Sequence, residues 1–525
     1  MKNRKIKIIA ILVACIMLFV ACSRGADNGV TPVSKIALQV LYTSVSNLDY
    51  SDFTAESWSD FENSLTVART VLANAEATQQ EVDAAYAALT YAYENLVLIE
   101  DNQPTKIMTR QQLEEITFDG HYILGADLDL TDFVPLGCNE NPFRGFFDGN
   151  GHTITSLTID IGALDIDSSG NVFVGIFAVN RGVIGDLIIE NILIFGTNAT
   201  SGIRVTVFVG AIAGRNRGYI HYVEVDGEIN FEATGADTRL RAGLIAGRND
   251  GVISYVVANG NIEAELIDGN SRLGGIAGLS DGGALIRCIA NVDILTSSRD
   301  GNIVAGGLVG LLEEDDVIID KSVASGDVTS IGITAIVYAG GLVGNIDATD
   351  VVGRPDFMVR DSYSTGDTHA ITGGNAYAAG LVARIENAGY AAVIIVLNTF
   401  SIGTVTMDST GSNRFASGLV GRIQWLNTSY IVIENSFTTS NIMVVHGASA
   451  STIRGTNAAN TSVVGEIINT FFAYDISGPS NLARQGTSVE REYLTLNFWQ
   501  EQNLNWDFDN IWQLREDNFP TLKGF

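Results

Sequence analysis

The stretch Ala305-Gly306-Gly307-Leu308-Val309-Gly310 decides the fold, because it returns as Ala339-Gly340-Gly341-Leu342-Val343-Gly344 and in looser form along the chain. Eight copies share a central glycine, and these glycines lie 32–39 residues apart. They are Gly175, Gly210, Gly243, Gly275, Gly307, Gly341, Gly380 and Gly418. Self-similarity at such a period predicts a repeat protein, in which each unit buries its apolar face by stacking on its neighbours.

Two turn signals frame the strands of each unit. The first follows the Gly-Leu-Val segment, at Asn180-Arg181-Gly182, Asn216-Arg217-Gly218 and Asn249-Asp250-Gly251. The second follows a Ser- and Val-rich segment, as at Gly260-Asn261-Ile262 and Gly326-Asp327-Val328. Asn and Gly adopt left-handed backbone angles at low cost, so both signals mark corners. Short β-branched runs between such corners, three per unit, predict a mainly β fold: a right-handed parallel β-helix (solenoid) preceded by a small three-helix bundle.

Competing architectures fit the repeat less well. Helical repeats share the period, but Gly-Leu-Val-Gly with Val-, Ile- and Thr-rich flanks is poor helix material. A propeller blade needs four strands and about 40–45 residues. The Asn residues at the first corner (Asn180, Asn216 and Asn249) leave two options open, a buried amide ladder between coils or side chains that face outward.

The composition describes an acidic but apolar chain. It is 46% hydrophobic with a mean hydropathy of +0.20, which is too apolar for a disordered protein. Its formal net charge is −29. Such acidity excludes nucleic acid as a partner, because phosphate groups need Lys and Arg to neutralise them.

The first 21 residues predict a targeting segment. Basic residues at 2–7 precede an apolar run over 8–20 that is short for a membrane helix. The run ends in Phe19-Val20-Ala21-Cys22, which resembles a bacterial lipobox. That resemblance implies loss of residues 1–21 as a lipoprotein signal peptide and a lipid on Cys22. The lipid would anchor the chain to a membrane outside the cytoplasm, at the cell surface, through a tether over 22–32. The alternative is an ordinary secretory signal with an incidental Cys22.

Residues 33–100 carry apolar residues at helical spacing. Leu38, Leu41 and Val45 begin the pattern, and Thr78-Gln79-Gln80-Glu81 has the form of a capping box. Ser57-Trp58 and Ala77-Thr78-Gln79, with Glu81-Val82-Asp83, resemble a FIVAR module, a short helical unit of bacterial surface proteins. The resemblance implies a spacer or adhesive module without catalytic residues, in which the aromatic residues form the core.

The repeat units resemble the GLUG motif. The copies at 305–310 and 339–344, each followed by a Ser- and Gly-containing strand, carry the resemblance most closely. It implies a bacterial surface β-helix with an N-terminal cap and opening coils over 106–173, repeats over 174–480 and a C-terminal capping segment over 481–525. Some relatives of that family cleave immunoglobulin A with zinc, but this chain has no His-Glu-x-x-His. Trp499, Trp506 and Trp512 fit a cap, with a sugar-stacking platform as the alternative.

Extra residues accumulate at one corner of consecutive units. The spacing from the second turn to the next central glycine is nearly constant, whereas the spacing from that glycine to the next second turn grows in the later units. Insertions at a shared corner would stack into a ridge over 345–360, 384–397 and 422–433, where aromatic, acidic and amide side chains suit a carbohydrate. The alternative is loop variation without function. The ridge residues are Asp347, Asp350, Arg354, Asp356, Glu386, Asn387, Tyr390, Gln424, Trp425 and Tyr430.

Familiar catalytic and metal-binding patterns are missing. The five histidines have no metal-ligand spacing, so we expect no metal and no other cofactor. Asp127 and Asp129 are spaced to share a strand face and could hold Ca²⁺, with a solvated face as the alternative. Cys138 and Cys288 are expected to be buried and unpaired.

These observations predict a non-catalytic, lipid-anchored bacterial surface protein. Its expected work is adhesion, or binding of carbohydrate or extracellular matrix protein, through the flank of the β-helix. One alternative is a β-helix polysaccharide-active enzyme, either a lyase or a glycosidase. Arg215 and Arg248 occupy matching corners, which gives slight support to a lyase. The other alternative is a passive stalk or spacer.

Overall fold

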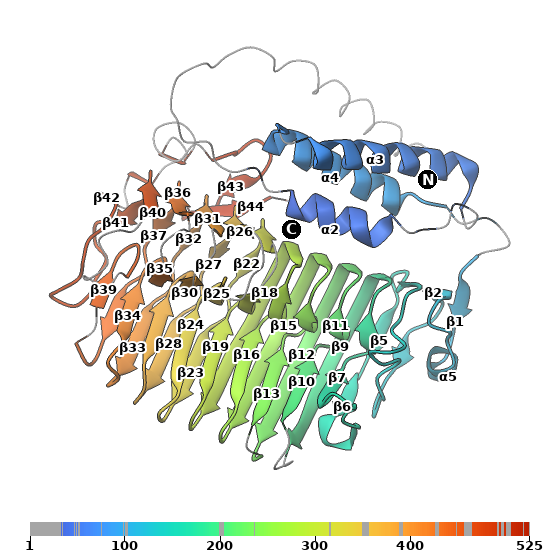
Figure 1. Ribbon diagram of the computed structural model, residues 1–525, viewed down its shortest axis with the longest axis horizontal. Coiled ribbons are helices and arrows are strands. Elements are labelled where there is room, and N and C mark those ends of the chain that lie inside the picture. Colours follow the sequence, from blue (N-terminus) through green and yellow to red (C-terminus); the bar gives the residue numbers. More distant parts are fainter. Residues whose placement is uncertain are drawn as a thin grey trace. The chain divides into compact units, whose positions relative to one another are not determined.

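The computed structural model describes the chain from Val33 to Lys523 with interruptions. The predicted mainly β fold is confirmed: a parallel β-solenoid follows a short helical region (Figure 1). Cys22 and its tether lie outside the described residues. The structure does not describe residues 1–32, 34, 47, 49, 51–52, 75, 98, 100–102, 199–203, 236, 314–316, 349–355, 388–391, 426–429, 448, 456–464, 491–492, 495–497, 500–505, 518 and 524–525.

Three helices occupy the region predicted to be helical. They are α2 (Ile36–Val45), α3 (Ala55–Ala73) and α4 (Gln79–Glu94). Leu38, Leu41 and Val45 are fully buried, as the helical spacing predicts. The capping box is present, because Thr78 Oγ1 accepts from Glu81 N at 3.3 Å while the Glu81 carboxylate accepts from Thr78 N at 2.7 Å. Two N–H groups that the helix cannot satisfy itself are thereby bonded.

The helices and the solenoid belong to one compact unit. The Tyr93 ring of α4 lies 5.9 Å from the ring of Tyr219. Arg360 Nη2 of the solenoid donates to Asp83 Oδ1 of α4 at 3.0 Å. The helices therefore pack on the solenoid through both apolar and charged side chains.

Short elements open the solenoid. They are β1 (Thr105–Ile107), α5 (Arg110–Glu114), β2 (His121–Leu124), β3 (Leu128–Asp129), β4 (Phe146–Asp148), β5 (Thr153–Thr155), β6 (Thr158–Asp160) and the 3₁₀ turn η3 (Ile161–Ala163). Leu113 of α5 is fully buried, and Ile116 packs against the same core. Both side chains face inward, as expected for a capping helix.

Each later coil contributes to three sheets, as predicted. Sheet 1 contains β7 (Asn171–Val174), β10 (Val205–Val209), β13 (Thr238–Ala242), β16 (Asn270–Gly274), β19 (Asn302–Gly306), β24 (Ile336–Gly340), β29 (Ala376–Ala379), β34 (Arg414–Ser417) and β39 (Ser449–Ser451). Sheet 2 contains β8 (Phe177–Asn180), β11 (Ala213–Asn216), β14 (Ala246–Asn249), β17 (Ala277–Asp281), β20 (Val309–Glu313), β25 (Val343–Asp347), β30 (Val382–Asn387) and β35 (Val420–Trp425).

Sheet 3 also contains β1 to β6 and forms the longest side of the coils. Its early strands are β9 (Val183–Asn198), β12 (Tyr219–Ala233), β15 (Val252–Leu266) and β18 (Ala284–Ser298). Later coils divide this side into β21 (Val317–Asp320), β22 (Val323–Ala324), β23 (Val328–Gly332), β26 (Asp356–Arg360), β27 (Tyr363–Ser364), β28 (Thr368–Thr372), β31 (Val393–Leu397), β32 (Phe400–Ser401), β33 (Val405–Ser409), β36 (Tyr430–Glu434), β37 (Phe437–Thr438), β38 (Ile442–Val444), β40 (Gly465–Ile468), β41 (Phe471–Ala473) and β42 (Thr487–Val489).

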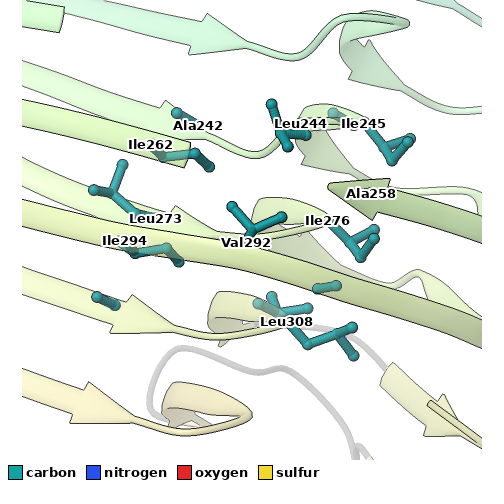
Figure 2. Packing of buried hydrophobic residues seen from close by; sticks show 14 of the residues in the cluster. Ala242, Leu244, Ile245, Ala258, Ile262, Leu273, Ile276, Val292, Ile294 and Leu308 are labelled. Carbon is teal, nitrogen blue, oxygen red and sulfur yellow. The ribbon is translucent and has the colours of Figure 1, made fainter. Parts of the chain in front are cut away.

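Apolar side chains from all three sheets fill the space inside the coils. Ile262 pairs in register with Ile294, and Ala242 with Leu273, so like side chains stack on one another (Figure 2). Burying each such Ile or Leu stabilises the fold by roughly 1.5–3 kcal/mol. The repeat alignment made on sequence is confirmed at every step but one. Between β13 and β16 the register differs from it by one residue, so that Gly243, which follows Ala242, aligns with Gly274 instead of Gly275.

The Asn residues at the first corner face inward and form a ladder. Asn180 Nδ2 donates to Asn216 Oδ1 at 2.9 Å, and Asn216 Nδ2 donates to Asn249 Oδ1 at 2.8 Å. All three side chains are fully buried. Of the two options left open by the sequence, the buried amide ladder is confirmed, because the ladder satisfies polar groups that water cannot reach.

The C-terminal segment packs along the flank of the coils. Its antiparallel hairpin contains β43 (Trp512–Leu514) and β44 (Pro520–Leu522). Trp499 and Trp512 are fully buried against a stack of rings that includes Phe400 and Phe437. Trp506 Nε1 donates to Asn435 O at 2.9 Å. The sugar-stacking alternative for these tryptophans is therefore wrong, since their faces are already covered by the protein.

The two described cysteines differ in environment. Cys288 is buried on β18, as predicted, and burial raises the pKa of its thiol to about 12. Cys138 is exposed, so its predicted burial is wrong. It lies in a turn after Gly137, which has a φ of 76°, and outside the regular alternation of a strand.

Candidate functional site

The insertions occur at the corner between sheet 2 and sheet 3. Two residues separate β11 from β12, whereas longer segments separate β25 from β26, β30 from β31 and β35 from β36. Asp347, Glu386 and Gln424 of the predicted ridge lie in register on β25, β30 and β35. Asp350, Arg354 and Tyr390 lie outside the described residues, as do the side chains of Asp356, Asn387, Trp425 and Tyr430.

Two of the described ridge residues, Glu386 and Gln424, are bonded to Arg384 of sheet 2. Arg384 forms an ion pair with Glu386 and donates from Nη2 to Gln424 Oε1 at 3.0 Å. Burial, with the neighbouring charge of Asp347, raises the pKa of Glu386, while Arg384 opposes this shift. The ridge therefore adjoins a second surface, which the sequence did not single out.

That surface is a groove on the outside of the solenoid where sheets 1 and 2 meet. A second apolar cluster lies there, separate from the core, with Val304 and Tyr338 from sheet 1 and Leu279 and Leu311 from sheet 2. Each sheet contributes one in-register column of side chains to the groove. The sheet 1 column is Phe173, Phe208, Arg241, Arg272, Val304, Tyr338, Tyr377 and Phe415. The sheet 2 column is Val179, Arg215, Arg248, Leu279, Leu311, Asn345, Arg384 and Arg422.

Rings and guanidinium groups interleave at one end of the groove. Tyr338 and Tyr377 stack at 5.0 Å, and Tyr377 and Phe415 at 6.0 Å. The Arg384 guanidinium lies 5.3 Å from the Tyr338 ring and 5.4 Å from the Tyr377 ring. Arg422 lies 5.4 Å from Tyr377 and 4.9 Å from Phe415. The faces of these three rings are covered by one another and by the two guanidinium groups. The stack is therefore a rigid wall that leaves no ring face for a sugar.

A cavity of about 240 Å³ opens in the middle of the groove. Its charged lining comprises Arg239, Arg241, Arg272 and Arg384 against Asp347 and Glu386, which gives 4 − 2 = +2. Asn270, Asn302 and Asn345 add amide groups. The volume is slightly below the roughly 300–1,000 Å³ of small-molecule pockets, so the cavity suits one ring-sized group of a longer ligand.

Several polar atoms of the groove are buried without a hydrogen-bond partner. Within the described part of the chain, Asn345 Oδ1 and the Nε atoms of Arg384 and Arg422 are in this state. Asn345 is only 5% exposed and lines the cavity. An unsatisfied buried polar group costs about 1–3 kcal/mol, so these atoms favour a ligand that supplies donors and acceptors.

In the middle of the groove and at its other end, several arginines are paired with carboxylates. Arg215 and Arg248 are in register, as their matching corners predicted, and Asp250 accepts from the Nε of each at 2.5 Å. Arg272 Nη1 lies 3.0 Å from Glu313 Oε1. Arg241 lies 5.1 Å from the Phe208 ring, and no salt bridge to it is found among the described residues.

The sheet 1 column of the groove has a recognisable place in the sequence. This column lies just before each Gly-Leu-Val motif. The offset from the first motif position is one residue in the three early copies, as for Arg241 before Ala242, and two residues in the later copies, as for Tyr338 before Gly340. Because Phe, Arg, Val and Tyr alternate there, the column has no common residue type. The column can therefore be recognised only when the pairing register of the strands is known.

The acidic pair considered for Ca²⁺ is already bonded within the protein. Asp127 accepts from Thr153 N at 3.0 Å and lies 3.1 Å from His152 Nδ1. Asp129 accepts from Thr131 N at 2.9 Å. The described residues contain no group of three or more His, Cys, Asp or Glu that could hold a metal ion. No helix in the described part is long and apolar enough to cross a bilayer.

The helical region is similar to a known protein family. Residues 36–97 match the FIVAR domain. The FIVAR assignment made from the capping box and its neighbours is thus confirmed. A "Putative Gly-rich membrane protein" of Evansella cellulosilytica is 35% identical over an alignment of 119 residues, and the match covers 20% of this chain. The match spans only 12% of that protein's length.

The structure also aligns with a solved structure described as a "putative immunoglobulin A1 protease" from Bacteroides ovatus. The alignment covers 81% of this chain and 93% of the Bacteroides chain. The two chains are 17% identical, and their TM-score is 0.32. A likeness at this level does not bear on activity. The resemblance of the repeats to the GLUG motif remains a prediction.

Proposed function

We propose that the protein is a lipid-anchored bacterial surface protein that binds carbohydrate, in an adhesive or matrix-binding role, without catalysis. The groove between sheets 1 and 2 carries this proposal. Its cavity combines guanidinium, carboxylate and amide groups with buried polar atoms that lack a partner, such as Asn345 Oδ1. Such a lining suits a ligand rich in hydroxyl groups, because hydroxyls both donate and accept.

The ridge and the groove adjoin each other. Asp347 and Glu386 were predicted as ridge residues and also line the cavity. An extended glycan lying across several coils could contact both surfaces. The FIVAR domain and the GLUG-like repeats, a surface-protein type by resemblance, agree with a location outside the cell.

A glycan and matrix-protein array with the wild-type protein tests the proposal directly. Retention of at least one glycan supports it, and an empty array contradicts it. The variant with both Trp425→Ala and Tyr390→Ala then tests the ridge. Tyr474→Ala is a matched control, because Tyr474 is 64% exposed and lies on neither surface. Unchanged retention by the double variant removes the ridge and leaves the groove as the site.

The lipid anchor needs a separate experiment. Wild-type protein from cells grown with labelled fatty acid should carry the label and sediment with membranes. Cys22→Ser should lose the label and the sedimentation together. A labelled Cys22→Ser protein, or an unlabelled wild type, contradicts lipidation at this residue.

One observation favours a glycosidase as the second candidate function. Asp347 and Glu386 are in register on neighbouring strands and both line the cavity. Neighbouring parallel strands lie about 4.8 Å apart, and retaining glycosidases place their two carboxyl groups about 5–5.5 Å apart. Release of reducing sugar that is abolished by Glu386→Gln and Asp347→Asn would establish this alternative. Absence of turnover on every retained glycan argues for binding alone.

A further inference from the structure

We propose that the basic middle of the groove, formed by Arg239, Arg241 and Arg272, recognises an anionic group, so that the ligand is an acidic polysaccharide carrying carboxylate or sulfate groups. This inference rests on the proposed function and names its ligand class. Arg239 and Arg241 lie on β13 and Arg272 on the neighbouring β16. All three line the same cavity.

The two arginines of the sheet 1 column occupy a position that the adjoining coils fill with apolar side chains. Arg241 and Arg272 are directly paired in register, which places two like charges on adjacent coils. Like charges opposite one another destabilise a sheet. The coil before Arg241 has Phe208 at the same position, and the coil after Arg272 has Val304. An apolar side chain thus serves this position in both adjoining coils, so the arginine pair calls for another explanation.

Among the described residues, only one member of this pair forms a salt bridge with a carboxylate. Arg272 pairs with Glu313, whereas Arg241 meets the Phe208 ring and Arg239 carries no salt bridge that involves a described residue. Burial and the neighbouring charge of Arg272 together lower the pKa of Arg241 to about 9, and the charge of Glu313 only partly opposes this shift. Arg241 therefore remains charged at neutral pH in a place that disfavours its charge. An anion in the cavity would supply the missing opposite charge.

The other residues that line the cavity favour a glycan over a polymer with a negative charge at every unit. Asp347 and Glu386 lie in the same cavity and would repel a chain with a phosphate at every unit, such as a nucleic acid. Carboxylates can accept hydrogen bonds from sugar hydroxyls, and Asn270 and Asn302 can both donate and accept. A chain that alternates anionic groups with hydroxyl-rich rings matches this mixture. The basic patch also stands out in a chain with 31 Lys and Arg against 60 Asp and Glu.

The test uses the full-length protein and titration calorimetry at low and moderate salt. The probes are a polyuronate, a sulfated glycan, their carboxyl-reduced and desulfated forms, and single-stranded DNA. We expect one of the two acidic glycans to bind, its neutralised form to bind at least tenfold more weakly, and affinity to fall with salt. Which acidic polymer binds separates carboxylate from sulfate. Equal binding of the acidic and neutralised forms overturns the inference, as does preferential binding of DNA.

Substitutions place the anionic contact on the named residues. Arg241→Gln should weaken binding of the acidic glycan about 10- to 100-fold, the range expected for loss of a charge-assisted hydrogen bond. Arg144→Gln is the matched control and should change affinity less than twofold, because Arg144 is an exposed arginine of the opening coils that pairs with Asp119. Wild-type affinity in Arg241→Gln refutes the assignment. Neutral glycans bound without dependence on Arg241 would also refute it, while leaving the proposed function in place.

A stability measurement guards against variants that simply unfold. Arg241→Phe copies the preceding coil, so it should unfold at the same temperature as wild type or higher, since it removes a repulsive charge. The acidic glycan should raise the unfolding temperature of wild type but not of Arg241→Phe. A lower unfolding temperature for Arg241→Phe without glycan would mean that Arg241 serves the fold, and would overturn the inference.

Discussion

Removal of one rung of the asparagine ladder tests how much the buried amides stabilise the solenoid. The change is Asn216→Ala, in the centre of the ladder. The Asn216 side chain donates to Gly218 O at 3.3 Å, Asn249 Oδ1 at 2.8 Å and Val252 O at 3.2 Å. It accepts from Asn180 Nδ2 at 2.9 Å and from Gly218 N at 3.2 Å.

The expected loss follows from what truncation leaves behind. Asn180 Nδ2 keeps a bond to Gly182 O, and Asn249 Oδ1 keeps one from Gly251 N. The buried Gly218 N–H loses the partner found for it, at about 1–3 kcal/mol, and the two amide–amide bonds contribute about 0.5–1.5 kcal/mol each. Asn216→Ala should therefore lower the free energy of unfolding by about 2–6 kcal/mol.

Urea unfolding followed by far-ultraviolet circular dichroism measures this loss, and hydrogen exchange over residues 213–220 locates it. Asn291→Ala is the matched control. Asn291 also donates to an asparagine of the adjacent coil, Asn259 Oδ1 at 2.9 Å, but this pair is exposed. The control should cost less than about 0.5 kcal/mol. If both variants lose equally little, the buried ladder does not stabilise the coils and the reasoning fails.

Three further outcomes follow from the burial or exposure of individual side chains, among them His221, which is buried on β12. Burial lowers the pKa of His221 to about 4, below the unfolded value of about 6.5, so the free energy of unfolding should fall as the pH drops from 6.5 to 4. His221→Phe should reduce that fall by up to about 3 kcal/mol. Identical acid unfolding of the wild type and the variant would contradict this prediction. A maleimide should modify Cys138 in the folded protein and Cys288 only after unfolding, as peptide mapping would show, and early labelling of Cys288 would count against its burial. Trp512→Ala should cost about 3–5 kcal/mol and make the C-terminal segment accessible to protease, while an unchanged digestion pattern would mean that this ring does not hold the segment.

The fold could be predicted from the sequence because its signals are repeated. The Gly-Leu-Val motif and the Asn-x-Gly corner recur in coil after coil, and recurrence distinguishes a solenoid from an isolated strand pattern. The Thr78–Glu81 capping box is similarly local and was predicted correctly. What the sequence left open, such as the direction of Asn216, depends on burial that only the stacked coils create.

The groove could not be predicted because its members share a position but not a residue type. Arg241 and Tyr377 occupy the same column and look unrelated in the sequence. A one-residue ambiguity, such as Gly274 against Gly275, also moves every neighbouring side chain to the other face of its strand. The extra residues could be placed at the correct corner, since insertion length shows in the sequence, but Asp347 and Glu386 also line a cavity that only the structure reveals. Contacts distant in the chain, such as Trp506 with Asn435, leave no local trace.

The in-register columns have a consequence for how such a protein can change over generations. The two edges of a coil, which pair with the preceding and the following coil, have the same parallel strand pattern. Duplication or loss of a single coil in the gene would therefore preserve the strand pairing on both sides. Such an event would lengthen or shorten the outer groove by about 4.8 Å and leave its remaining contacts in phase. The span of the ligand could thus be adjusted in whole steps, without redesign of a folded interior.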